Sequence, residues 1–193
     1  MIIKDRSKLE TPCEVVSIKE GEEIGVRLLH ELRESKSGIG LAANQIGINK
    51  RVCVINVKEP MVLINPNIID VSEEKFKFAE GCLSFPNDKI KTLRYNWIKV
   101  HADNHDSTLV FSAESGDIND AFECACVQHE IDHLDGITMF DREFKSEPII
   151  NGINAPKKIG RNEKVTITKG TESKVLKYKK IQPLLEDGWV LSV

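Results

Sequence analysis

The chain has 193 residues, of which 40% are hydrophobic and 30% are charged, enough for one sizeable core or a core domain with a small appendage. It has no apolar run near the ~20 residues that cross a bilayer, and its first residues lack the features of a secretory signal, so we expect no membrane partner and no export. Five cysteines, an odd number, argue against a disulfide framework and favour a reducing compartment such as the cytoplasm.

Charge divides the chain into two regions. Residues 1–144 carry 17 basic and 25 acidic side chains, a net charge of −8, whereas residues 145–193 carry 10 and 5, a net charge of +5. We therefore predict a main domain over residues 1–145 and a basic extension over residues 146–193. The extension is predicted to contain a linker, a β-hairpin, a short helix and a strand, at residues 148–156, 164–178, 181–188 and 189–193.

The first predicted element is an amphipathic helix. Ser17 followed by Glu20 matches a capping box, and Ile24, Leu28 and Leu32 then recur at every fourth position. This spacing predicts a helix of about four turns that ends near the following Ser-Lys-Ser-Gly. Two glycines in its first half weaken the prediction.

The segment from Gly38 to Gly47 is rich in glycine and small residues. Glycine permits backbone conformations that other residues resist and lets another chain come close, and Gln45 offers both a donor and an acceptor. The phosphate-binding patterns Gly-x-Gly-x-x-Gly and Gly-Lys-Ser/Thr are absent. A tight turn before a strand and a binding loop both fit this segment.

Several segments of β-branched or alternating apolar residues predict strands. They are residues 51–57, 61–66, 75–79, 97–102 and 108–112. A polar turn separates the last two segments, which predicts a hairpin. His101 and His105 lie in or beside it and are interpreted as surface or strand histidines, and Cys53 is interpreted as core filler.

The second predicted helix carries His-Glu-x-x-His. It begins near residues 116–120, where acidic side chains meet the positive end of the helix dipole, and Gly136 is its expected C-cap. One broad face is predicted to contain Phe122, Ala125, Cys126, His129, His133 and Leu134. The two histidines therefore point inward, one turn apart, where they can hold one divalent metal while Glu130 reaches a water on it. This direction argues against a surface helix with two chance histidines.

A catalytic site of this kind needs a third ligand and an open position for water. Cys82 is the best candidate because it follows a predicted strand and because Gly81 before it allows close backbone approach. One cysteine and two histidines form a tetrahedral set that suits Zn²⁺ or Fe²⁺. A nucleophilic Cys82 with a histidine base is the alternative, which the histidine pair makes unnecessary. Cys124 and Cys126 diverge on a helix and are given little weight as ligands.

Three blocks together resemble the motifs of the peptide deformylase family. They are Gly-Ile-Gly-Leu-Ala-Ala-Asn-Gln, Glu-Gly-Cys-Leu-Ser and Gln-His-Glu-Ile-Asp-His-Leu-Asp-Gly, at residues 38–45, 80–84 and 128–136. The resemblance spans residues 8–142 and implies a hydrolase that removes the formyl group from the N-terminal formylmethionine of nascent polypeptides and releases formate. It also implies an α+β fold, with antiparallel or mixed β-sheets packed around a central helix that carries the metal ligands.

The resemblance implies a role for each matching residue of the metal site. Cys82, His129 and His133 are expected to bind the metal, which is Fe²⁺ in the family's usual form, with Zn²⁺ or Ni²⁺ as substitutes. Glu130 is expected to be the general base that takes a proton from the attacking water and returns it to the leaving amine.

The resemblance also implies how the substrate is held. The Gln45 side-chain amide and the Leu83 backbone N–H are expected to donate to the developing oxyanion. The peptide is expected to lie as an added strand along Ile39, Gly40 and Gly81, with its methionine side chain beside Ala125 and the face of His129. Glu80 and Asp132 are candidates for supporting the metal ligands, although solvated or structural carboxylates fit both positions equally.

Two other classes of protein fit parts of the pattern. An ordinary His-Glu-x-x-His metallopeptidase usually takes a downstream histidine or glutamate as its third ligand, and no histidine follows His133. A non-enzymatic metal-binding module, or a degenerate relative, would need neither Glu130 nor Gln45. The upstream Cys82 fits a deformylase better than either alternative.

The basic extension departs from the family pattern. Residues 158–163 are similar to the opening of a cysteine-rich zinc appendage found on some deformylases, but the zinc-binding cysteines are absent, so no second metal is predicted. A solvated lysine-rich tail and a tail that contacts ribosomal RNA both fit, and the second is our hypothesis. We expect a monomer that acts on N-formylmethionyl peptides in the cytoplasm, with no DNA partner; a phage enzyme in its host's cytoplasm and an organellar enzyme also fit.

Overall fold

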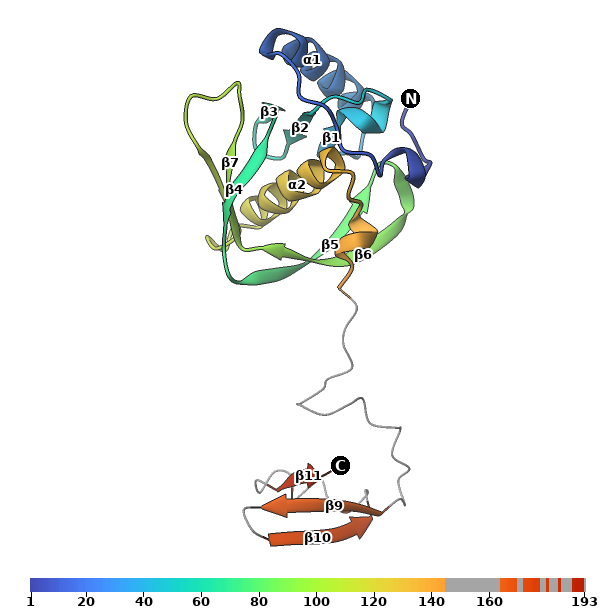
Figure 1. Cartoon of the computed structure of the whole chain (residues 1–193), viewed down its shortest axis with the longest axis vertical. Coiled ribbons are helices and arrows are strands. Elements are labelled where there is room, and N and C mark those ends of the chain that lie inside the picture. Colours follow the sequence, from blue (N-terminus) through green and yellow to red (C-terminus); the bar gives the residue numbers. More distant parts are fainter. Residues whose placement is uncertain (145–163, 170–171, 178–179, 181–183, 185–188, 193) are drawn as a thin grey trace. The chain divides into compact units, whose positions relative to one another are not determined.

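The chain divides into two units, Met1–Lys145 and Ser146–Val193. The computed structural model describes residues 1–144, 164–169, 172–177, 180, 184 and 189–192 (Figure 1). Short 3-10 helices η1 (Arg6–Lys8), η2 (Ala43–Ile46) and η3 (Met139–Arg142) connect the main elements of the first unit. No helix among the described residues is long and apolar enough to cross a membrane.

Helix α1 (Ile18–Glu34) begins at the predicted capping residue. The Ser17 hydroxyl accepts the Glu20 N–H at 3.3 Å, which satisfies one free N–H group of the first turn. The helix buries Ile24, Leu28 and Leu32, which form its apolar stripe, and packs on three strands that lie within residues 40–64. The predicted amphipathic helix is therefore confirmed.

Gly21 and Gly25 bring α1 close to strand β3 (Pro60–Ile64). A Cβ atom on Gly21 would lie 2.7 Å from the Ile64 side chain, and one on Gly25 would lie 2.5 Å from the Val62 side chain. The two glycines that weaken the helix by propensity thus permit a close approach of helix to sheet.

Strands β1 (Gly40–Ala42), β2 (Val52–Asn56) and β3 form an antiparallel sheet in the order β1-β2-β3. Cys53 is fully buried there, as expected of core filler. The glycine-rich segment supplies β1 and then η2, and it ends at Gly47, whose φ of 84° is left-handed. The segment is therefore a strand followed by a tight turn, and its strand was not predicted.

Strands β4 (Asn67–Val71), β7 (Trp97–His101) and β8 (Leu109–Ser112) form a second antiparallel sheet, in the order β4-β7-β8. The pair β7–β8 is the predicted hairpin. His101 is exposed, and the His105 ring lies 3.3 Å from the Val62 carbonyl oxygen. Neither histidine belongs to the group of described residues that could hold a metal ion.

Strands β5 (Lys75–Cys82) and β6 (Phe85–Tyr95) form a long two-stranded antiparallel ribbon. We predicted only the first part of β5 and none of β6. The β6 sequence begins Phe-Pro-Asn-Asp-Lys, in which Pro-Asn-Asp is typical of a turn. It becomes a strand because it pairs with β5, from Cys82 opposite Phe85 to Lys75 opposite Tyr95.

Helix α2 (Ile118–Leu134) lies at the centre of the first unit, as predicted, in contact with β1, β2, β6 and β8 (Figure 1). Every residue from Cys124 to Leu134 is buried. This corrects the prediction of one broad buried face, since Cys124 was placed on another face, and Phe122, placed on the buried face, is 39% exposed. Strands cover the helix on several sides, so its C-terminal half has no solvent face. Gly136 follows with a φ of 74° and ends the helix as predicted.

The second unit contains strands β9 (Lys164–Lys169), β10 (Glu172–Lys177) and β11 (Val190–Ser192), in the antiparallel order β10-β9-β11. Buried Ile167 and Trp189 form its small core. Strands β9 and β10 lie within the segment predicted to be a hairpin, and β11 lies within the segment predicted to be the final strand. The predicted linker and nearly all of the predicted short helix lie outside the described residues.

Candidate metal centre

Three ligand candidates converge where the end of strand β5 meets helix α2. Cys82 ends β5, and His129 and His133 lie one turn apart on α2. Their ligand atoms all lie within 4.8 Å of one another, and all three residues are buried. The Cys82 Sγ lies 3.2 Å from the His133 Nε2. Within the described residues, these three form the group that can hold a metal ion.

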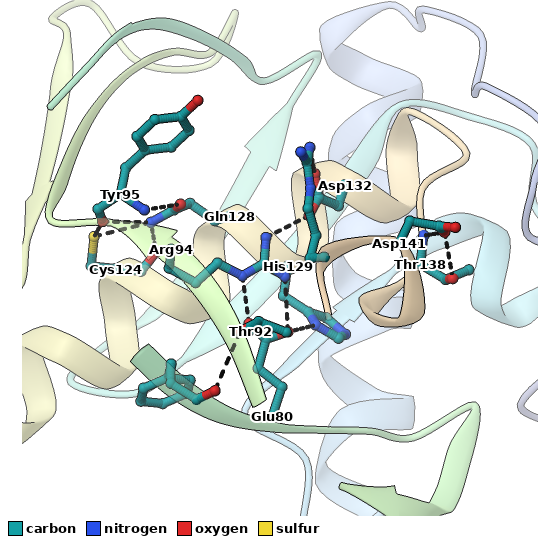
Figure 2. A network of polar contacts seen from close by, with 12 residues as sticks. Glu80, Thr92, Arg94, Tyr95, Cys124, Gln128, His129, Asp132, Thr138 and Asp141 are labelled. Atoms are coloured by element: carbon teal, nitrogen blue, oxygen red, sulfur yellow. Dashed lines mark hydrogen bonds and ion pairs between the residues drawn. The ribbon is translucent and has the colours of Figure 1, made fainter. Parts of the chain in front are cut away.

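A hydrogen bond to Glu80 orients the ring of His129. The His129 Nδ1 lies 2.8 Å from Glu80 Oε2, and an Nδ1–H donated there leaves Nε2 as the candidate ligand atom (Figure 2). The His133 Nδ1 is buried with no hydrogen-bond partner among the described residues. A thiolate sulfur and two imidazole nitrogens form a donor set that fits a divalent transition metal.

The two imidazoles differ in their affinity for protons. Burial lowers the pKa of His129, but hydrogen bonds to Cys82 and Glu80 outweigh it and raise the pKa to about 10. Burial, together with the charge of His129, holds the pKa of His133 well below its usual range. A metal on His129 Nε2 must displace a proton, so metal binding is expected to weaken as the pH falls.

A buried ionic network supports His129 through Glu80. Arg94 on β6 donates to both Glu80 oxygens, from Nε at 2.5 Å and from Nη2 at 2.8 Å, and its Nη1 donates to Asp132 Oδ2 at 2.5 Å (Figure 2). Arg142 donates to Asp132 Oδ1 at 2.7 Å. Burial raises the pKa of Glu80, but Arg94 and His129 outweigh it and hold the pKa well below its usual range.

The burial of Glu80 and Asp132 excludes one of the alternative interpretations of these carboxylates. Glu80 and Asp132 are 4% and 6% exposed, so neither is a solvated carboxylate. Glu80 touches a ligand candidate directly, whereas Asp132 acts on the site through Arg94. Sequence reasoning missed Arg94 because its strand was not predicted.

Glu130, which the resemblance predicts to be the general base, is buried beside the ligand candidates. It is 4% exposed, and its Oε2 has no hydrogen-bond partner among the described residues. Burial raises its pKa to about 7, although His129 acts in the opposite direction. A Cβ atom on Gly40 would lie 2.4 Å from Glu130 Oε1, so only glycine leaves this carboxylate its place.

The two expected oxyanion donors lie next to the ligand candidates. Gln45 Oε1 accepts the Ala42 N–H at 2.8 Å, and Gln45 Nε2 donates to Ser84 Oγ at 3.1 Å and lies 3.4 Å from Cys82 Sγ. Leu83 and Ser84 form the tight connection between Cys82 and Phe85, which face each other across the β5–β6 ribbon.

A cavity of about 550 Å³ opens beside these groups. The residues expected to bind substrate all line it: Ile39, Gly40, Gly81 and Ala125, together with Gln45 and Leu83. Phe78 and Phe122 also line it, with ring centroids 5.1 Å apart in an edge-to-face arrangement. This aromatic wall was not predicted, because it joins β5 to the start of α2 and no local pattern reports such a contact.

Comparisons with known proteins identify one family. The family model for polypeptide deformylase matches residues 2–148. A peptide deformylase from Natranaerobius thermophilus is 42% identical over 124 residues, which cover 63% of this chain and 75% of that protein. One from Aquifex aeolicus is 38% identical over 151 residues, which cover 74% and 85%.

Solved structures give the same result for the fold. The peptide deformylase from Thermotoga maritima superposes with a TM-score of 0.64 at 29% identity, covering 74% of this chain and 96% of that one. A probable peptide deformylase from Synechococcus phage S-SSM7 gives a TM-score of 0.62 at 35% identity, covering 74% and 98%. The chain therefore belongs to the polypeptide deformylase family, the metal-dependent hydrolases that remove the formyl group from the N-terminus of nascent polypeptides.

Proposed function

We propose that Cys82, His129 and His133 bind the catalytic metal of this deformylase, Fe²⁺ in the native enzyme, with Zn²⁺ or Ni²⁺ able to substitute. The observation that carries the proposal is the convergence of one thiol and two imidazoles within 4.8 Å in a buried site. When bound, the ion supplies a Lewis acid beside the formyl carbonyl and lowers the pKa of a water molecule.

Glu130 takes the proton from the attacking water and returns it to the leaving amine. Its buried carboxylate, with one oxygen free of hydrogen bonds, supports this role. The Gln45 side-chain amide and the Leu83 backbone N–H donate to the oxygen of the formyl group as it gains charge. Their place beside Cys82 supports these roles.

The peptide lies along the backbone of Ile39, Gly40 and Gly81 as an added strand. Its methionine side chain enters the cavity beside Ala125. Phe78 and Phe122 extend the apolar lining of that cavity, and a thioether packs well against aromatic edges. All the residues of the proposed site come from one chain, so we propose that the enzyme is a monomer. We also propose that the enzyme acts in the cytoplasm, where formylated chains are made.

One assay tests the metal assignment and the substrate assignment together. Iron-loaded protein, kept under anaerobic conditions, is expected to release formate from formyl-Met-Ala-Ser. A chelator should abolish this release, and Fe²⁺ should restore it. The Cys82→Ser variant should bind less than one equivalent of metal, while Cys53→Ser, which changes a buried cysteine of the core, should keep full metal content. Full metal content and activity in Cys82→Ser would contradict the ligand assignment.

The dependence of activity on pH follows from the Glu130 carboxylate. Because burial raises the pKa of this carboxyl group to about 7, with the His129 charge acting in the opposite direction, kcat/KM is expected to rise with pH through a limb near 7. The sign follows because only the deprotonated carboxylate accepts a proton. Activity that falls as the pH rises through this limb would contradict the role. The profile is measured with formyl-Met-Ala-Ser at constant ionic strength.

We also propose that the basic second unit contacts ribosomal RNA. Lys164 and Lys177 are exposed and lie directly opposite each other in the β9–β10 pair, an arrangement that like charges disfavour and that a polyanion would relieve. Exposed Lys174 lies on the same hairpin and packs over the Trp189 ring, 4.1 Å from its centroid.

The ribosome contact is tested by co-sedimentation at several salt concentrations. Changing Lys164 and Lys177 together to glutamine is expected to weaken ribosome binding and to reduce its salt slope by about one for each lost phosphate contact. The control is Lys89→Gln, which removes an exposed charge from the first unit. Unchanged binding after deletion of residues 149–193, or binding that does not respond to salt, would contradict the proposal.

A further inference from the structure

Two consecutive residues near the N-terminus bond to the two segments that carry the proposed oxyanion donors. The Ile3 backbone N–H donates to the Gln45 carbonyl oxygen at 2.7 Å. The Lys4 ammonium group donates to the Leu83 carbonyl oxygen. One short stretch of chain therefore bonds to both donor residues.

Apolar contacts hold the same stretch in place. Ile3 packs against the cluster that contains Cys82 and Phe85, the two residues on either side of the β5–β6 turn. Ile2 and Leu83 both pack against a second cluster that contains Ile46. The segment Ile2–Lys4 thus touches both sides of the site by packing as well as by hydrogen bonds.

Gln45 and Leu83 do not lie on strands of the same sheet, so no shared set of strand hydrogen bonds fixes the distance between them. Gln45 lies in η2, after β1, whereas Leu83 lies in the turn of the β5–β6 ribbon, and β1 belongs to a different sheet from β5 and β6. Side-chain contacts from Gln45 to Cys82 and Ser84 join the two segments at the site itself. The backbones behind those side chains are joined by Ile3 and Lys4.

We propose that Ile2–Lys4 positions the two oxyanion donors relative to each other, with Lys4 as a positioning residue of the reaction. This inference rests on the proposed roles of Gln45 and Leu83. Lys4 acts through the Leu83 carbonyl, which fixes the turn that carries the Leu83 N–H. Stabilisation of an oxyanion depends on donors held at the right distance before charge develops, so a donor that drifts costs rate and little binding.

Lys4 offers a clean test because its side chain is exposed and no core contact depends on its charge. Lys4→Met keeps the apolar stem and removes the donor, and Lys4→Arg restores a donor. The matched control is Lys8→Met, which removes another exposed cation near the N-terminus, outside that segment. For each iron-loaded full-length variant, kcat and KM with formyl-Met-Ala-Ser, metal content and melting temperature are measured.

The Lys4→Met variant is expected to lose about tenfold in kcat, less than the roughly 10²–10³-fold cost of removing a donor outright. Its KM, metal content and melting temperature should stay close to wild type, Lys4→Arg should recover most of the loss, and Lys8→Met should show none. A fall in kcat that merely follows lost metal or stability would assign Lys4 a structural role and overturn the proposal.

An unchanged kcat in Lys4→Met, beside an active wild type, would overturn this inference alone. Failure of the proposed function would look different, because the wild type itself would then release no formate. The two failures are therefore separated by the wild-type assay run in parallel.

Discussion

Replacing Glu130 with glutamine is expected to lower kcat/KM for formyl-Met-Ala-Ser by about 10²–10⁴-fold, the usual contribution of a positioned acid–base group. Glutamine has nearly the same size as glutamate, so the buried site around Gly40 should stay packed, but its amide cannot accept a proton from the attacking water. Metal content should remain at the wild-type level, because Glu130 is not among the ligand candidates. Formate release and bound iron are measured on the same sample.

The matched control is Glu114→Gln, which makes the same chemical change at an exposed position and should leave activity unchanged. Full activity in Glu130→Gln with metal retained would refute the base assignment. If folded, metal-loaded wild type released no formate, a metal-binding module would become the better description, and cleavage of unformylated peptides would be the next assay.

Replacing Arg94 with methionine is expected to have the largest effect on stability. Arg94 is 2% exposed and is the cation shared by Glu80 and Asp132. Its removal leaves two buried carboxylates short of a partner, which costs about 3–5 kcal/mol in the free energy of unfolding. Glu80 would also hold His129 less firmly, and loss of such support lowers metal affinity by about 10–100-fold. Denaturant unfolding and metal titration measure the two effects.

A surface ion pair provides the contrast. Lys99 and Asp70 form a pair in which both side chains are more than two-fifths exposed, and Lys99→Met should shift the unfolding midpoint little. Equal effects of Arg94→Met and Lys99→Met would mean that the buried network contributes no more than a solvated pair.

The features that sequence alone predicted are those with a local signature. Ser17 and the fourfold spacing after it predict α1 because helix caps and helix faces are encoded within a few turns. The spacing of His129 and His133 likewise predicts one metal-facing side of a helix. Cys82 could be placed with them because a glycine precedes it at the end of a predicted strand and because the three motifs occur together.

The features that were missed depend on contacts between distant residues. Arg94 became part of the site only when β6 paired with β5 and brought it to Glu80, and nothing in its immediate neighbours reports that pairing. Phe78 and Phe122 meet across two elements for the same reason. Full burial of Cys124 reflects strands on several sides of α2, whereas periodicity can describe only the helix itself.

The enclosure of α2 bears on how the enzyme acquires its metal. In a zinc finger the ion itself supplies much of the folding free energy, whereas here protein contacts hold the ligand candidates: the helix that carries them is buried from Cys124 to Leu134, and Glu80 and Arg94 support His129. We therefore expect that metal loading and exchange require no refolding, and one thiol with two imidazoles is a donor set that suits more than one divalent transition metal. On this expectation, the supply of free metal in the cell and the rate of metal release would set which ion a molecule carries, and enzyme purified from cells grown on different metals should differ in metal content while sharing one fold.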